Sequence, residues 1–174
     1  MKNILIVVIG NTGNESESLR QSLEAFGYFV ATSYVGRPND FIAILNGQIP
    51  FDPDCIILSC HGDDGRIVMP PVGEDVYQPD EPRGNFTAME VDHHLSVHDK
   101  LILNLGCTTG NSDLANAFSK QNTYIAPCDY VEGNAALYFA ISLFYEISKA
   151  DTSLQVAFEV AKAHDNETSL FHIF

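Results

Sequence analysis

Residues 55–65 read CIILSCHGDDG, an apolar run that stops abruptly at small, polar and acidic residues. A continuous apolar run of this length, bounded by turn residues, is typical of a strand buried on both faces. Residues 101–110 repeat the pattern with LILNLGCTTG, in which a second apolar run ends in a glycine-rich turn. Residues 4–9, ILIVVI, form a third such run, which the loop 10–14 follows. These runs predict the central strands of a parallel sheet.

Segments with helical patterns alternate with the strands along the chain. Thr87 and Glu90 have the spacing of a capping box, and Asn39 or Asp40 is the expected cap of a helix that ends at Leu45. The other expected strands are residues 28–35, 66–69 and 124–126, and the other expected helices are residues 15–26, 111–119, 134–148 and 152–163, with a proline-rich loop at 70–85. The pattern predicts an α/β fold, a three-layer αβα sandwich with a mostly parallel central sheet, in which residues 1–174 form a single domain.

The chain is strongly acidic, with 23 acidic and 9 basic residues and a formal net charge of −14. This surface would repel both nucleic acid and anionic membranes, so neither is an expected partner. A basic peptide or protein would be attracted. Because acidity also keeps proteins soluble, the charge alone does not identify the partner.

Metal sites, cofactors and export signals have little support in the sequence. No two of the four cysteines form a C-x-x-C pair, and no third ligand completes the helical spacing of His94 and His98. The loop 10–14 matches neither of the common phosphate-binding motifs. His164 and His172, in a polar C-terminal stretch, are expected at the surface. The N-terminal apolar run is too short for a membrane span or a signal peptide, so we expect a cytoplasmic protein without metal or cofactor.

His61 and Cys107 each follow a predicted buried strand, at the carboxyl end where α/β sheets bind ligands. A cysteine nucleophile needs a base to raise its thiolate fraction, and it needs donors for the oxyanion that forms. Gly62 has no side chain, so its N–H can approach a substrate closely. The N–H of Cys107, expected at the start of a helix, is the second candidate donor.

This order of elements resembles that of the caspase-like cysteine peptidases, the group that contains caspases, metacaspases, gingipains, legumain and separase. There a strand ending in His-Gly is followed, after about fifty residues, by a strand, a small residue and a Cys. Three segments resemble the bacterial CHAT-type branch most: residues 86–90 (FTAME), 106–110 (GCTTG) and 152–158 (TSLQVAF).

The resemblance implies a cysteine endopeptidase that cleaves peptide bonds through a thioester. It makes His61 the general acid and base, Cys107 the nucleophile, and the N–H groups of Gly62 and Cys107 the oxyanion hole. It also implies a peptide or protein substrate and allows for a regulatory protein partner. Metacaspase-like enzymes carry an acid two residues before the nucleophile to bind a basic side chain. This chain has Leu105 there, so a dedicated Arg/Lys pocket is not supported.

Loops at the carboxyl edge of such a sheet are expected to form the substrate cleft. We therefore expect a shallow cleft with an acidic rim, formed by Asn11, Asn14, Asp63, Asp64, Asp129 and Glu132. Acids at this rim would disfavour an acidic substrate side chain.

Two alternatives remain open. The chain could be a catalytically inactive caspase-like fold that acts as a protein-interaction module, in which case Cys107 would not react with alkylating agents. It could also be a glutaminase-type or flavodoxin-like α/β protein. The glutaminase elbow, Gly-x-Cys-x-Gly, would place the cysteine one position later than Cys107, with a base late in the chain, where only His164 and His172 are available.

Overall fold

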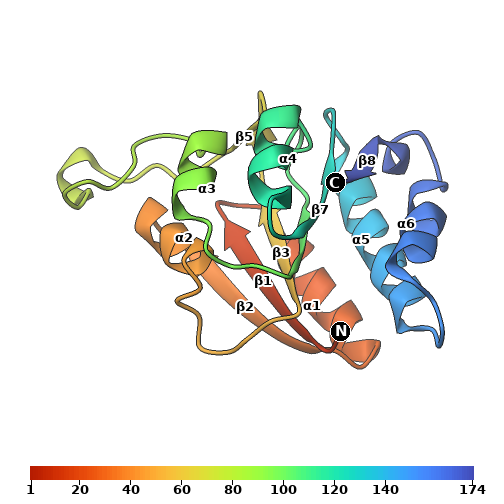
Figure 1. Cartoon of the computed structure of the whole chain (residues 1–174). Coiled ribbons are helices and arrows are strands. Elements are labelled where there is room, and N and C mark those ends of the chain that lie inside the picture. Colours follow the sequence, from red (N-terminus) through yellow and green to blue (C-terminus); the bar gives the residue numbers. More distant parts are fainter.

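A six-stranded sheet forms the centre of the computed structural model, which describes all 174 residues. The strands of this sheet are β1 (Asn3–Ile9), β2 (Phe29–Val35), β3 (Cys55–Cys60), β6 (Leu101–Asn104), β7 (Thr123–Pro127) and β8 (Phe171–Ile173). Their order is β2–β1–β3–β6–β7–β8, and all neighbours are parallel except β7 and β8 (Figure 1). The mostly parallel sheet predicted from the sequence is therefore confirmed.

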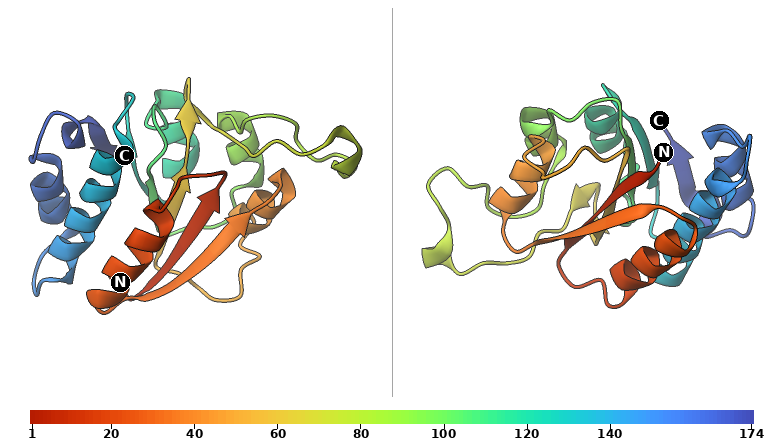
Figure 2. Two further views of the ribbon diagram at one scale, coloured as in Figure 1. Left: turned by 180° about the vertical axis from the view of Figure 1, so that it is seen from behind. Right: turned by 90° about the horizontal axis from the view of Figure 1, so that it is seen from below.

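Helices cover both faces of the sheet, as Figure 1 and Figure 2 show. One face carries α1 (Glu15–Ala25), α5 (Gly133–Ser148) and α6 (Leu154–Lys162), and the other carries α2 (Pro38–Leu45), α3 (Ala88–His94) and α4 (Ser112–Ser119). Single 3₁₀ turns, η1 (Glu74–Val76) and η2 (Thr168–Leu170), lie in connecting segments. None of the helices combines the length and the apolar character that a membrane crossing needs. The three-layer αβα sandwich is confirmed.

Strand alternation divides the interior into two cores of 22 buried residues each. Along β1, Ile4 and Ile6 contribute to the core under α1, α5 and α6, while Leu5 and Val7 contribute to the opposite core. Each such buried side chain stabilises the fold by about 1.5–3 kcal/mol relative to exposure. The continuous apolar runs arise because both faces of these strands are covered.

The helix caps agree with the sequence at α3 but not at α2. Thr87 and Glu90 form the predicted capping box at the start of α3. The helix α2 begins at Pro38, so neither Asn39 nor Asp40 is its cap. Asp40 is the third helical residue, and its carboxylate accepts the backbone N–H groups of Gly36 and Arg37 just before the helix. The prediction failed because the fixed φ of proline suits the first position of a helix, so the helix starts at Pro38, before either candidate cap.

The C-terminal segment and the region after β3 also differ from the prediction. Residues 171–173 form the edge strand β8, and Phe171 is buried against Phe139 with ring centroids 3.9 Å apart. His172 is exposed, as expected for that stretch. In place of one strand at 66–69, a short hairpin pairs β4 (Gly62–Asp63) with β5 (Arg66–Ile67).

The segment 70–85 is a loop that extends away from the sandwich, as Figure 1 shows in yellow-green. One buried side chain, that of Glu81, ties it to the start of α2. The carboxylate of Glu81 accepts hydrogen bonds from the Arg37 guanidinium and from the Asn39 N–H. The Arg37 guanidinium lowers the pKa of Glu81 to about 2, so this anchor stays charged at neutral pH.

Candidate active site

His61 and Cys107 lie at the same edge of the sheet because the strands that precede them are neighbours. β3 and β6 pair in parallel, with Leu58 opposite Asn104 at the end of the ladder. His61 directly follows β3, and Cys107 follows β6 after two residues. Both residues are thus at the carboxyl ends of adjacent parallel strands, where α/β proteins bind their ligands.

The segments that carry the two residues make contacts on the same face of the sheet. Leu105 belongs to the core under α1, α5 and α6, and Cys107, two residues later, packs against the same core. On β3, the Ser59 hydroxyl reaches the Glu15 carboxylate at the start of α1, with an O···O distance of 2.6 Å. His61 is two residues beyond Ser59, just past the end of β3, and its charge acts on the same Glu15 carboxylate.

The His61 ring is held by a backbone carbonyl of the loop that follows β1. Its Nε2 atom lies 2.8 Å from the carbonyl oxygen of Asn11. Since a carbonyl oxygen only accepts, Nε2 carries the proton in this hydrogen bond. In the neutral ring Nδ1 is then the unprotonated nitrogen, which is available to accept a proton. Asn11 was predicted as a residue of the substrate cleft, and the structure adds that its backbone carbonyl holds the His61 ring.

Gly62 is pressed against the turn that carries the cysteine. A Cβ atom at Gly62 would lie closer than 3.0 Å to the carbonyl oxygen of Cys107 and to the methyl group of Thr109. Cβ atoms are essentially never found so close to other atoms, so only glycine fits at this position. The backbones at Gly62 and Cys107 are therefore in direct contact.

Cys107 occupies a turn and not the start of a helix. α4 begins at Ser112, so the expectation that the Cys107 N–H belongs to a helix terminus is wrong. The side chain is half-buried, and its Sγ–H points to the carbonyl oxygen of Val131, with an S···O distance of 3.4 Å. Val131 belongs to the β7–α5 loop, which thus lies beside the thiol.

The residue after the cysteine has a strained backbone. Thr108 has a φ of +59°, in the left-handed region that β-branched residues avoid. Two contacts hold it there: its N–H donates to the Asp129 carbonyl, and its hydroxyl accepts from the Gly65 N–H, both at 3.0 Å. Strain of this kind costs about 1–3 kcal/mol and is commonly retained at functional sites.

Asp63 and Asp64, two of the predicted rim acids, follow Gly62 in the hairpin. Asp63 accepts a hydrogen bond of 2.6 Å from the hydroxyl of Tyr130, which raises the pKa of Tyr130. This bond bridges the hairpin and the β7–α5 loop, the two segments that flank Cys107. Asp64 lies 3.7 Å from the Arg66 guanidinium in an exposed pair. Tyr130 was missed by sequence reasoning because an exposed tyrosine in a loop carries no pattern of its own.

The other residues predicted to form the substrate cleft are Asn14, Asp129 and Glu132, and each of them has different contacts. Asn14 precedes α1 without capping it through its side chain. The Asp129 backbone holds Thr108, as described above, and the Glu132 N–H donates to the Glu167 carboxylate. Asp64 lines a hollow of about 410 Å³ and Glu132 lines another of about 400 Å³. The predicted acids thus share an edge of the sheet but do not converge on one hollow.

Comparisons with known proteins identify the fold. No protein-family model matches the chain, and no curated protein sequence matches it. Among solved structures, a secreted C11 cysteine protease from Bacteroides thetaiotaomicron matches with a TM-score of 0.57 at 12% identity. The Arg-specific cysteine proteinase gingipain R matches with a TM-score of 0.59 at 10% identity. The matches cover 92% and 96% of this chain and 57% and 44% of those proteins.

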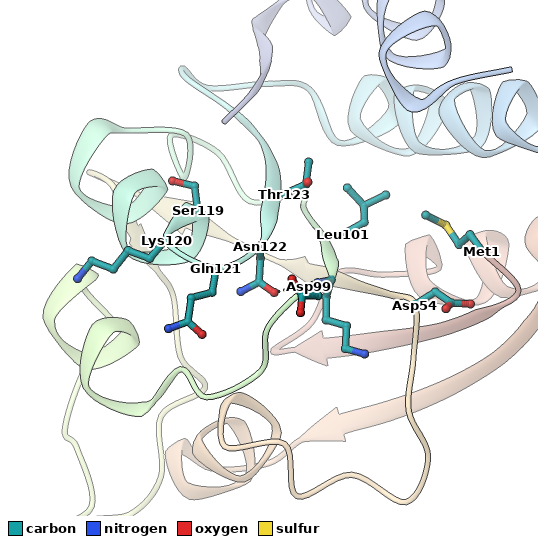
Figure 3. A pocket seen from close by; sticks show the side chains of 10 residues that line it. Met1, Asp54, Asp99, Leu101, Ser119, Lys120, Gln121, Asn122 and Thr123 are labelled. Atoms are coloured by element: carbon teal, nitrogen blue, oxygen red, sulfur yellow. Dashed lines mark hydrogen bonds between the residues drawn. The ribbon is translucent and has the colours of Figure 1, made fainter.

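The fold is that of the caspase-like cysteine peptidases. The chain spans only about half the length of these two solved structures. A hollow of about 650 Å³ lies at the opposite edge of the sheet (Figure 3). Residues around the amino ends of β3, β6 and β7 line it, among them Asp54, Lys100 and Asn122. It is therefore separated from His61 and Cys107 by the length of the strands.

Glu15, in the first turn of α1, is a half-buried acid that the sequence did not single out. It accepts from Ser59, and the Thr12 hydroxyl lies 2.8 Å from that of Ser59. Burial raises the pKa of Glu15, while the hydrogen bond from Ser59 and the charge of His61 oppose the shift. Acidic residues are common in the first turn of a helix, so nothing in the local sequence marks Glu15 as part of a site.

Replacing Glu15 by glutamine is expected to raise the melting temperature at pH 8. Because the pKa of Glu15 is higher in the folded protein than in the unfolded chain, its ionised form opposes folding. The stabilisation from the protonated form is complete below the unfolded pKa and is lost as the pH rises through the folded pKa. The gain of Glu15→Gln, measured by thermal unfolding, should therefore disappear near pH 4. Glu17→Gln, which removes an exposed pair with Arg20, is the control and should give no gain.

Proposed function

We propose that this chain is a cysteine endopeptidase in which Cys107 is the nucleophile and His61 is the general acid and base. The observation that carries the proposal is the parallel pairing of β3 with β6, because His61 and Cys107 follow the carboxyl ends of these two neighbouring strands. The close approach of Gly62 to the carbonyl oxygen of Cys107 supports it further, since it brings the residue after His61 against the turn that carries the thiol.

In the proposed mechanism, His61 Nδ1 accepts the proton of the Cys107 thiol while the Asn11 carbonyl holds the Nε2–H. The thiolate attacks the carbonyl carbon of the substrate, and the N–H groups of Gly62 and Cys107 stabilise the oxyanion. When the C–N bond breaks, His61 returns the proton to the departing amine, which leaves a thioester on Cys107. A water molecule, deprotonated by His61, then releases the acid product and restores the thiol.

Within the caspase-like peptidases, we place the chain nearest the CHAT-type branch. The segment 86–90 enters α3 through a capping box, and residues 152–158 lead into α6. These segments support the assignment through sequence resemblance alone.

The proposal also includes a single domain over residues 1–174, a cytoplasmic location and a regulatory protein partner. The C11 protease of similar fold is itself secreted.

Two contacts favour the inactive alternative. The Cys107 thiol donates to the Val131 carbonyl rather than to His61, and the Tyr130–Asp63 bridge crosses between the segments beside it. In a catalytically inactive interaction module, this arrangement would be permanent. In a peptidase, the β7–α5 loop has to move before the thiol can transfer its proton. The glutaminase-type and flavodoxin-like alternatives lose support, because the fold matches cysteine proteases.

A panel of fluorogenic peptides that differ at P1, the residue before the cleaved bond, tests the proposal. We expect cleavage after basic or neutral residues to exceed cleavage after Asp by about tenfold or more, because Asp63, Asp64 and Asp129 would oppose a desolvated carboxylate. The same enzyme alkylated with iodoacetamide is the control and should be inactive. Preferential cleavage after Asp would show that the acids point away from the substrate, and a basic residue such as Arg66 would then line the pocket.

A further inference from the structure

Asn104, the last residue of β6, is a fully buried amide with three hydrogen-bond partners. Its Oδ1 accepts from the N–H of Gly106 at 2.9 Å and from the thiol of Cys60 at 3.2 Å. Its Nδ2 donates to the hydroxyl oxygen of Tyr124 at 3.1 Å. The amide therefore ties β3 and β7 to the first residue of the turn that carries Cys107.

Tyr124, in β7, continues the chain of hydrogen bonds to the far end of the same turn. Its hydroxyl donates to the carbonyl oxygen of Thr109 at 3.0 Å. The hydroxyl of Thr109 in turn donates to the carbonyl oxygen of Gly106 at 2.6 Å. The ring is fully buried and is stacked on Phe118, with centroids 4.7 Å apart and an interplanar angle of 10°. The turn is thus fixed at both ends by side chains that lie beneath it.

Burying the polar groups of Asn104 and Tyr124 in the core lowers the stability of the fold unless every one of them has a hydrogen-bond partner. The surrounding core is apolar, and burying an unpaired amide or hydroxyl costs about 1–3 kcal/mol by mutational measures. The strands β6 and β7 already pair through their backbones, so they need no such side chains to stay together. Buried polar networks of this kind, when fully satisfied, fix one conformation of the backbone.

We propose that Asn104 and Tyr124 are positioning residues that hold the turn from Gly106 to Thr109, and with it the thiol and the N–H of Cys107, in place for catalysis. This inference rests on the proposed function of Cys107 as a nucleophile. Neither side chain reaches the substrate; both act through the turn. Strain at Thr108 makes the support necessary, because a left-handed β-branched residue relaxes unless its neighbours prevent it.

The test compares two tyrosine-to-phenylalanine variants. Tyr124→Phe keeps the stacked ring and removes only the hydroxyl that joins Asn104 to Thr109. Tyr28→Phe is the matched control, since its buried hydroxyl donates to the Phe144 carbonyl at 3.1 Å, in the core beneath α1 and α5. We expect Tyr124→Phe to lower kcat by about tenfold with KM within about twofold, because displacing a nucleophile by a fraction of an ångström slows the chemical step. We expect Tyr28→Phe to leave both constants unchanged.

A second measurement separates this inference from the proposed function. The rate at which iodoacetamide alkylates Cys107 is followed by mass spectrometry at pH 7, and it is expected to fall about threefold in Tyr124→Phe only. If the wild-type protein cleaves no peptide, the proposed function fails, and the alkylation rate alone decides whether the network holds the turn. Equal kcat and alkylation rates in Tyr124→Phe and the wild type, or equal losses in both variants, would overturn the inference.

Discussion

Substitution of Cys107 by alanine is expected to abolish peptide hydrolysis, with kcat reduced by about 10³-fold or more. In the proposed mechanism the thioester forms on the Cys107 sulfur, with His61 as its base, and alanine has no nucleophile to replace it. The fold should survive, because the side chain is only half-buried and its single hydrogen bond is a weak one to Val131. The measurements are turnover of a fluorogenic peptide and the melting temperature of the purified variant.

Cys128 offers a matched control for this substitution. It follows β7 at the same edge of the sheet, it is exposed, and its thiol donates to the Gly110 carbonyl at 3.4 Å. Cys128→Ala is expected to keep turnover within about twofold of the wild type, as is usual for surface substitutions away from a site. Residual turnover in Cys107→Ala that equals that of Cys128→Ala would remove Cys107 from the mechanism and leave the inactive alternative in place.

The parts of the fold that could be predicted are those with a strong local pattern. β1, β3 and β6 were recognised because burial on both faces makes them continuous apolar runs. β8 was missed because it is three residues long and only Phe171 of them is buried, so no period is visible. The start of α2 was misplaced because two local signals compete there. Proline favours the first helical position, whereas asparagine and aspartate favour the cap before it.

Only the part of the candidate site that lies directly at the strand ends could be predicted from the sequence. His61 and Cys107 each terminate an apolar run, and the rule for parallel sheets then brings them to one edge. Glu15, Asn104, Tyr124 and Tyr130 depend on contacts between segments far apart in sequence, and none of them carries a local motif. The separation of Asp64 and Glu132 into different hollows follows from loop paths, which strand and helix patterns do not encode.

Substitution of Gly62 by alanine should reduce kcat almost as strongly as loss of an oxyanion-hole donor does elsewhere, by about 10²–10³-fold. The added methyl group would lie closer than 3.0 Å to the Cys107 carbonyl oxygen and to the Gly106 carbonyl carbon, both of which are backbone atoms. Backbone cannot rotate away as a flexible side chain can, so the hairpin and the turn must separate. Such overpacking also costs about 1–3 kcal/mol of stability.

Gly73→Ala is the control for this variant, because Gly73 lies in the loop 70–85 with a φ of −61°. Its added Cβ would meet only the Val76 side chain, at an ordinary 3.6 Å. Activity is measured at a temperature at which both variants are folded, so that loss of stability does not count as loss of catalysis. Because the separation moves the Gly62 N–H away from the oxyanion while His61 and Cys107 keep their own anchors, the loss should appear in kcat more than in the alkylation rate of Cys107. A Gly62→Ala enzyme with full kcat would show that the oxyanion is stabilised by other donors.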